Sequence, residues 1–203
     1  MIPAMWAELS TTLTGERIEL QPLAERHRHA LRVAAGDERI STWLPAELHD
    51  PAGFEAAFAG ALEASASGFE VPFATVSRVD GAIVGSTRFL ELRPEHRSVE
   101  IGWTWLAPAA WRTGANVEAK LLMLAHAFET VGCIRVELKT DARNERSRLA
   151  MEALPAQFEG IHRQHRVLPD GTLRDSAWYS VLDGEWPTVR ANLERRLAAA
   201  RPT

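Results

Sequence analysis

A short polar turn in this chain has residue types that could bind an anion. Residues 112–116 read Arg-Thr-Gly-Ala-Asn and precede a run with helical periodicity. The first N–H groups of a helix have no partner within the helix, and the positive end of its dipole lies there, so phosphate binds favourably. The P-loop ending and the three-glycine dinucleotide fingerprint are both missing, which disfavours ATP and NAD. The alternative is an ordinary helix start, capped by Thr113 or Asn116.

The helix that follows this turn is predicted from its hydrophobic period. Its apolar residues recur at helical spacing and should face the core; they are Val117, Leu121, Leu124, Ala125 and Phe128. We expect Glu118 and Lys120, which fall between them, to face water.

The remaining elements alternate between strand and helix patterns. Two tight hairpin turns are predicted, at Asp80-Gly81 and at residues 168–171. Strand 99–106, the helix and strand 134–140 form a unit whose crossover is right-handed if the strands are parallel. The fold class is therefore mixed α/β. The other predicted strands are 17–20, 73–79, 82–92, 159–167 and 176–182, and the other predicted helices are 24–35, 53–64, 144–154 and 187–200.

Length and composition predict one domain. The 203 residues are 46% hydrophobic and 25% charged, which is enough for one substantial core, so we expect a single domain over residues 1–203. Residues Met1–Thr14 have no clear period, and we expect a flexible arm there. The segment 187–200 should form an amphipathic C-terminal helix.

Charge and cysteine content exclude several classes of function. A net charge of -4 argues against nonspecific nucleic-acid binding as the main function and so against a nucleic-acid partner, although it leaves a local basic patch open. The only cysteine, Cys133, excludes an internal disulfide, and we expect it to be buried in a cytoplasmic protein with no membrane partner. His162 and His165 are three apart in a predicted strand and should face opposite sides, so no metal site is expected.

Three motifs in order carry a resemblance to a known family. They are Val99–Trp103, Trp111–Asn116 and Thr140–Ser147. The chain resembles the GCN5-related N-acetyltransferases (GNAT), in the branch that includes the ribosomal-protein alanine N-acetyltransferases. This resemblance implies a central mixed, mostly antiparallel sheet of about seven strands with helices on both faces. It also implies a parallel splay between the fourth and fifth strands, 99–106 and 134–140.

The resemblance further implies acetyl-CoA as cosubstrate and a set of residues that bind it. The pyrophosphate would lie on Arg112, Thr113, Gly114, Ala115, Asn116 and Val117, and the pantetheine arm on the backbone near Trp103, Trp105 and Leu106. Asn144 would hold the pantetheine amide and Ser147 the thiol side. The alternative for these last two is a helix cap and a first-turn polar residue.

For the chemistry, we expect direct attack by an amine in a ternary complex, because no activated nucleophile is evident. Glu100 is the candidate base, acting through water. The alternative for Glu100 is a solvated strand residue or one that forms a salt bridge with Arg88 or Arg97. Trp43, Arg88 and Tyr179 are candidate substrate contacts. For Trp43 and Tyr179, the alternative role is packing in the core.

Two departures from the family pattern open a second interpretation. Met151 stands where many relatives carry a tyrosine that protonates the thiolate, and Pro155 stands where a glycine usually ends the helix, so we expect no left-handed exit. The chain is therefore either an N-acetyltransferase or a silent acyl-CoA-binding sensor or scaffold; an unrelated nucleotide binder is a third interpretation. The acceptor of an enzyme would be a protein N-terminus or a small amine, depending on whether an acidic groove or an aromatic pocket is present. A homodimer is compatible with the resemblance.

Overall fold

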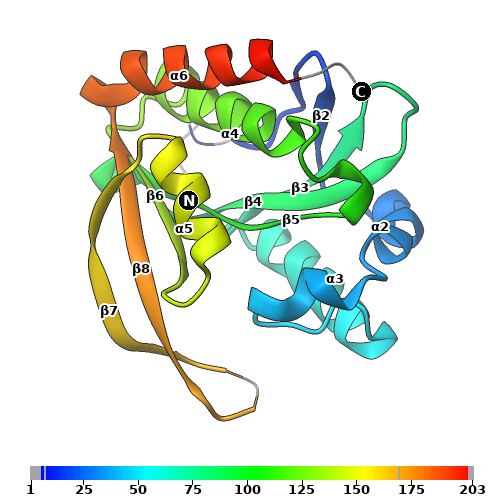
Figure 1. The fold of residues 1–203 in the computed structure, drawn as a ribbon. Helices are drawn as coiled ribbons and strands as arrows, with labels where there is room; N and C mark the ends of the chain where they lie inside the picture. Colours follow the sequence, from blue (N-terminus) through cyan, green and yellow to red (C-terminus); the bar gives the residue numbers. More distant parts are fainter. Residues whose placement is uncertain (1–5, 7, 169, 201–203) are drawn as a thin grey trace.

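A mixed eight-stranded sheet organises the molecule. The computed structural model describes residues 6, 8–168 and 170–200, and its strands run in the order β1-β2-β3-β4-β5-β6-β8-β7 (Figure 1). All neighbours are antiparallel except β5 and β6. The strands are β1 Leu13–Thr14, β2 Ile18–Pro22, β3 Val71–Ser77, β4 Ile83–Arg93, β5 Ser98–Leu106, β6 Arg135–Asp141, β7 Gln157–Val167 and β8 Leu173–Leu182. The sheet thus has one strand more than expected, because Leu13–Thr14 pairs with β2.

Helices cover both faces of this sheet, as predicted. Phe73 and Ala74 are neighbours on β3 and belong to different core clusters, so the clusters lie on opposite faces. One cluster packs under α4 and α6, and the other under α2 and α3 (Figure 1). The α-helices are α2 Arg28–Ala34, α3 Pro51–Ala66, α4 Ala115–Ala125, α5 Glu145–Ala153 and α6 Trp186–Ala199. Among the described residues, no helix is both long and apolar enough to cross a bilayer.

Short helical turns join several of these elements. Most are 3₁₀ turns, and the one that follows α4 is a π turn. They are η1 Glu25–His27, η2 Glu38–Trp43, η3 Pro94–His96, η4 Pro108–Ala110, η5 His126–Thr130 and η6 Asp183–Glu185.

The parallel strands β5 and β6 pair only at their beginnings. Their register runs from Ser98 opposite Arg135 to Glu100 opposite Glu137, and beyond this point they separate. On its other side, β5 is irregular against β4, and Trp103 adopts a φ of 50°. The bulge bends β5 away from β6. The expected splay between these two strands is confirmed.

The N-terminal segment packs against the core, although a flexible arm was expected there. Trp6, Leu9 and Leu13 are buried in the larger core cluster, and Leu13 begins β1. The described part of residues 1–14 is therefore not a free arm, because its apolar side chains reach the core. Residues 1–5 and 7 lie outside the described part.

Glu118 is buried, which corrects the expectation that it faces water. It is 4% exposed, and its carboxylate accepts hydrogen bonds from the backbone N–H groups of Glu16, Arg17 and Ile18 at 2.9, 2.8 and 2.7 Å. The carboxylate thus satisfies three backbone N–H groups, and that of the buried Ile18 would otherwise have no water to bind. Glu118 therefore fixes the β1–β2 hairpin on α4.

We predict that Glu118→Gln destabilises the protein. An amide keeps one acceptor oxygen and turns an N–H₂ group toward backbone donors, so the unfolding free energy should fall by about 2–4 kcal/mol. Urea unfolding measures this loss. Glu63→Gln on the exposed side of α3 is the matched control and should change stability by less than about 0.5 kcal/mol. Equal effects of the two substitutions would contradict the role of Glu118.

Candidate active site

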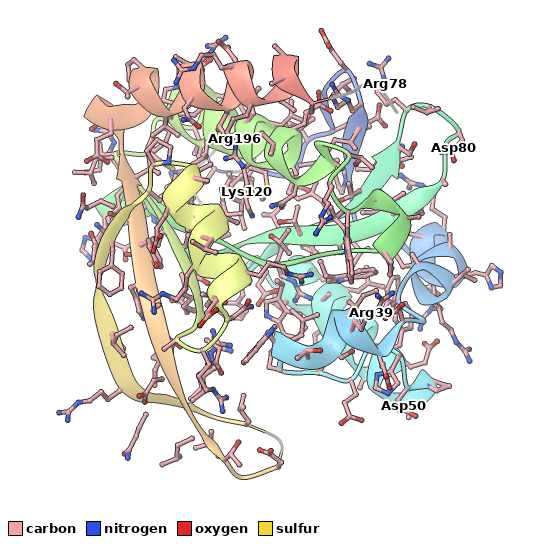
Figure 2. The ribbon with its side chains drawn as sticks, in the orientation of Figure 1. Arg39, Asp50, Arg78, Asp80, Lys120 and Arg196 are labelled. Carbon is pink, nitrogen blue, oxygen red and sulfur yellow. The ribbon has the colours of Figure 1, made fainter. Side chains whose placement is uncertain are left out.

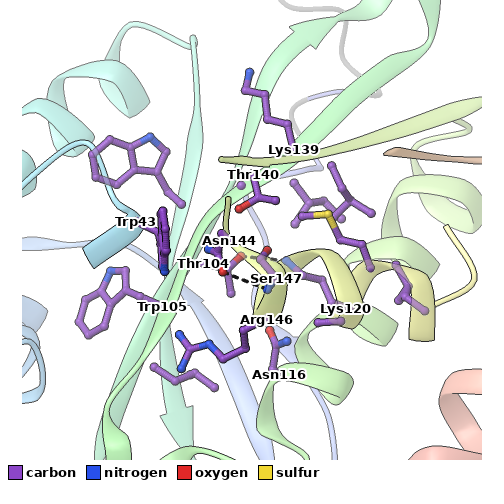
Figure 3. A pocket seen from close by; sticks show the side chains of 18 of the residues that line it. Trp43, Thr104, Trp105, Asn116, Lys120, Lys139, Thr140, Asn144, Arg146 and Ser147 are labelled. Atoms are coloured by element: carbon purple, nitrogen blue, oxygen red, sulfur yellow. Dashed lines mark hydrogen bonds between the residues drawn. The ribbon is translucent and has the colours of Figure 1, made fainter. Parts of the chain in front are cut away.

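A cavity of about 650 Å³ lies where β5 and β6 separate. The starts of α4 and α5 close it, and Figure 3 shows Thr104, Lys120 and Ser147 converging on one part of it. Residues from both strands, both helices and η2 contribute to its wall. The cavity therefore joins segments that are far apart in the sequence.

The start of α4 brings four of its six predicted anion-binding residues to the cavity. Arg112, Gly114, Asn116 and Val117 line it, and the left-handed φ of 90° at Gly114 turns the chain into the helix. The Oδ1 atom of Asn116 is buried and has no hydrogen-bond partner among the described residues. Such an atom fits a donor group of a bound molecule.

The other two predicted residues of this turn have structural contacts. Thr113 Oγ1 donates to Ala110 O at 2.8 Å and accepts from Ala115 N at 3.3 Å. Ala115 is 4% exposed and belongs to the core. Neither residue is part of the described cavity wall. Gly114 is the N-cap of α4 and the helix has no side-chain cap, so neither Thr113 nor Asn116 caps it.

The predicted strand residues Trp103, Trp105 and Leu106 all line the cavity. Leu106 O accepts a hydrogen bond from Trp111 Nε1 at 2.7 Å, so this carbonyl is already used. Because β6 does not pair with this part of β5, its edge is open to a partner on that side.

The start of α5 combines capping with a position in the wall. Asn144 Oδ1 accepts from Ser147 N at 3.1 Å, and both residues line the cavity. Arg146 also lines it, with its guanidinium 5.0 Å from the Trp111 ring centroid. Arg143, by contrast, pairs with Asp141 at 2.8 Å.

The end of α5 differs from expectation in one respect. Met151 lines the cavity where a tyrosine was expected in relatives. The helix ends with Ala156 N donating to Met151 O at 3.1 Å, and Pro155 has a φ of 23°. The chain thus leaves the helix through a residue with positive φ, which contradicts the expectation of no left-handed exit.

Glu100 is a wall residue with an ion-pair partner. It is 2% exposed, and its Oε2 lies 2.5 Å from Lys139 Nζ. Burial raises the pKa of Glu100 above its ordinary value of 4.5, and Lys139 opposes this rise. The two arginines considered as partners bind elsewhere: Arg88 pairs with Glu70 at 2.7 Å, and Arg97 donates to Gly132 O at 2.9 Å.

Lys120 is a cavity residue that the helical pattern assigned to water. It points from α4 toward the sheet (Figure 2), and its Nζ donates to Thr104 Oγ1 at 2.8 Å. Part of the Lys120 side chain is accessible from the cavity. The protein atoms packed around it nevertheless exclude most of the water that would solvate its ammonium group. This burial lowers the pKa of Lys120 to about 7, opposed by the charge of Glu100. Spacing could not reveal this, since a pattern of hydrophobicity cannot show a cavity.

Only one of the three predicted substrate residues lies in the cavity wall. Trp43 lines the cavity. Arg88 stacks on the Trp103 ring at 4.3 Å and pairs with Glu70, outside the described wall. Tyr179 is fully buried and bonds to Arg148 and Glu152, each at 3.1 Å, so its packing alternative fits better.

The two histidines of β7 are on the same side, which corrects the sequence expectation. Their ring centroids are 6.0 Å apart, and both rings contact Trp178. The strand period fails because pairing with β8 shifts between His162 and Arg166, with Gln164 at a φ of 51°. Within the described residues, no group of three or more His, Cys, Asp or Glu could hold a metal.

The single cysteine is buried in the core. Cys133 is free and 1% exposed, and burial raises its pKa to about 11. Its thiol therefore stays protonated near neutral pH and is not a nucleophile.

Comparison with known proteins gives consistent matches. Residues 17–157 match the model of the "Acetyltransferase (GNAT) domain". A GCN5-related N-acetyltransferase from Brucella melitensis superposes with a TM-score of 0.86 and 30% identity over 95% of this chain and 90% of that one. Mycobacterium smegmatis RimJ, solved with CoA-disulfide, superposes with a TM-score of 0.77 and 23% identity over 94% and 95%, which is a likeness of fold.

One curated relative points to the ribosomal branch. It is named "Putative ribosomal N-acetyltransferase YdaF" from Bacillus subtilis, and it is 30% identical over 53% of this chain and 57% of its own length. The matched region spans about half the length of the curated relatives. The resemblance to this branch is thus supported.

We predict that Lys120→Met stabilises the folded protein near neutral pH. Between pH 10.5 and about 7, the unfolded chain binds a proton at this lysine that the folded chain does not bind, so stability falls as the pH drops through this range and then stays low. Methionine cannot bind a proton, so the variant should not lose stability in this way as the pH drops. Thermal unfolding should show a melting temperature a few degrees higher at pH 7, with little gain near pH 10.5.

Lys139 offers a matched control, because it is the only other lysine in the chain. Lys139→Met leaves the buried Glu100 without its ion-pair partner and should lower the melting temperature at pH 7. A gain for Lys120→Met that did not change with pH would contradict a lowered pKa.

Proposed function

The chain belongs to the GNAT acetyltransferase family, and we propose that it transfers an acetyl group from acetyl-CoA to a primary amine within a ternary complex. The observation that carries this proposal is the cavity between the separating strands β5 and β6, closed by the starts of α4 and α5. The starts of these helices supply the predicted anion-binding and amide-binding residues. Bound acetyl-CoA supplies a thioester, and the protein supplies position and protons.

The residues present fit this cosubstrate. Arg112, Arg146 and Arg196 line the cavity and would attract phosphate groups. The unpartnered Oδ1 of Asn116 would accept a hydrogen bond from the ligand. The open edge of β5 beyond Glu100 would pair with a pantetheine arm as it would with a strand. These contacts orient the ligand along the gap in the sheet.

Glu100 is our candidate proton acceptor. It lies on β5 at the last residue that pairs with β6, which is the point where the gap begins. Its raised pKa suits a base that works near neutrality, and Lys139 can compensate its charge. The incoming nitrogen would lose its proton to Glu100 through water.

Lys120 is our candidate proton donor. Met151 cannot protonate a departing thiolate, whereas the ammonium of Lys120 reaches the same cavity and is held by Thr104. A pKa of about 7 keeps a large protonated fraction near neutral pH and makes the proton easy to release. Lys120 would therefore act where tyrosine acts in many relatives.

The acceptor, the oligomeric state and the compartment are also proposals. A protein N-terminus is supported by the name of YdaF, and a small amine by the presence of Trp43 and Trp103 in the cavity wall. A homodimer is supported by the edge strand β7, which exposes Ile161 and Val167. A cytoplasmic location is supported by the free, buried Cys133.

We predict that Arg146→Gln weakens acetyl-CoA binding. Losing one phosphate contact should raise the dissociation constant about tenfold at low salt, and less at high salt. Arg143→Gln is the matched control, because Arg143 is nearby on the chain and pairs with Asp141 instead. Calorimetry measures both variants. If the wild-type protein fails to bind millimolar acetyl-CoA, the proposed function is wrong.

We also predict that Glu100→Gln and Lys120→Met each lower kcat by about a hundredfold or more, with acetyl-CoA affinity little changed. Thiol release and mass spectrometry of the product measure turnover over a panel of amines. In the wild type, kcat should fall as the pH rises through about 7, because Lys120 then loses the proton that it donates. In Lys120→Met, this decrease of kcat with pH should be absent. Binding without turnover above background hydrolysis would favour the sensor interpretation over an enzyme.

A further inference from the structure

The cavity is strongly basic although the chain is acidic overall. The net charge of the protein is -4, yet among the described residues of the cavity wall only Glu100 is acidic. The basic ones are Arg112, Lys120, Lys139, Arg146, Arg166, Arg174 and Arg196. This is neither the acidic groove expected for a basic peptide nor a purely aromatic pocket. An anionic ligand is favoured throughout the cavity.

Two of these arginines face each other on the β7–β8 hairpin. Arg166 and Arg174 are directly opposite in the antiparallel register, and both line the cavity. Like charges at such a position repel and weaken a strand pair. Arg174 is also only 8% exposed, so its charge is largely removed from water. This arrangement costs stability unless an anion joins the two guanidinium groups.

No described carboxylate supplies that anion. Neither guanidinium forms an ion pair or hydrogen bond with another described residue, and the Nε atom of Arg174 is buried without a partner. Asp141 and Glu100, the two acids whose charges act on Arg174, already have partners. Asp141 binds Arg143 through both oxygens, and Glu100 binds Lys139. Burial lowers the pKa of Arg174, Asp141 opposes this, and Arg166 lowers it further.

The hairpin lies away from the expected phosphate site. Figure 1 shows β7 and β8 extending from the sheet on the side opposite α4, whose start we assign to the pyrophosphate. The phosphates of acetyl-CoA therefore do not account for this pair. What remains at this end of the cavity is the part that an acceptor would occupy, next to Glu100 and Lys139.

We propose that Arg174 and Arg166 bind a carboxylate or phosphate of the acceptor, so that the substrate is an amine carrying an anionic group. This inference rests on the proposed function, because it places the acceptor opposite the acetyl donor. Guanidinium groups suit both anions, since their planar donors match paired oxygens. The anion fixes the acceptor at one end while its amine faces Glu100.

Binding to the CoA-loaded protein tests this directly, and turnover tests it a second time. The matched probes are 2-aminoethyl phosphate and ethanolamine, which share an amine and differ in the anion; β-alanine extends the comparison to a carboxylate. Short peptides beginning Ala-Glu-Glu and Ala-Lys-Lys distinguish a peptide source of the anion from a small molecule. Calorimetry gives affinity, and thiol release gives kcat/KM.

We expect the anionic probes to bind at least about tenfold more tightly than ethanolamine, with Arg174→Gln and Arg166→Gln each removing most of this preference. Arg174→Lys should restore part of it. Arg163→Gln on the exposed part of β7 is the control and should leave it unchanged. Arg174→Gln removes the repulsion from Arg166 together with the attraction to Asp141, so the melting temperature of each variant is measured as well, and a variant that stays folded but loses the preference supports the site.

The outcomes separate the two proposals. If the protein binds CoA but shows no preference for anionic probes, or if Arg174→Gln leaves the preference intact, the anion site is wrong and the acetyltransferase proposal stands. If CoA does not bind at all, the proposed function is wrong. Anion-selective binding that depends on Arg174, even without turnover, supports the site.

Discussion

The loss of pairing between β5 and β6 is the constraint on which the rest of the site depends. A parallel pair normally continues for the length of its shorter strand, but here it stops after Glu100 and Glu137. A bulge around Trp103 bends β5 just beyond this point, and the two strands do not pair again. Backbone groups on the inner edge of β5 then face a cavity instead of a neighbouring strand, and an unpaired edge is favourable only if something else pairs with it. The gap therefore both creates the cavity and gives it a backbone surface that suits an extended ligand.

Helix α4 lines one side of this cavity and carries two charged residues with different roles. Glu118 points to the β1–β2 hairpin and binds three backbone N–H groups there, which anchors the helix to the sheet. Lys120 points into the cavity and meets Thr104 on β5. Glu118 stabilises the fold because both oxygens of its carboxylate accept hydrogen bonds, whereas Lys120 costs stability because burial disfavours its charged form more than Glu100 favours it. The same helix thus supplies rigidity at one position and a destabilised, titratable group two residues later.

The sequence predicted the order and type of almost every element, because hydrophobic periods, caps and hairpin turns are local signals. The C-terminal helix was expected at 187–200 and is Trp186–Ala199, and the strand at 99–106 is Ser98–Leu106.

Local signals failed where distant groups decide the outcome. Glu118 is buried by backbone about 100 residues away. His162 and His165 share a side because a bulge breaks the strand period, and bulges have no strong sequence signature. Of the predicted substrate contacts, Trp43 reaches the cavity wall while Tyr179 packs in the core.

The distribution of paired and unpaired charges separates the structural charges from the functional ones. Away from the cavity, buried or partly buried charges find partners: Arg135 binds Glu137 and Glu159, and Asp141 binds Arg143. At the cavity, Lys120, Arg166 and Arg174 are without carboxylate partners in the described structure. An unpaired charge in a protein interior costs free energy, so a fold under no functional demand would pair it or replace it. Since the cost is concentrated around one cavity, the simplest physical reason is a set of anionic ligands that provide the missing charge when they bind.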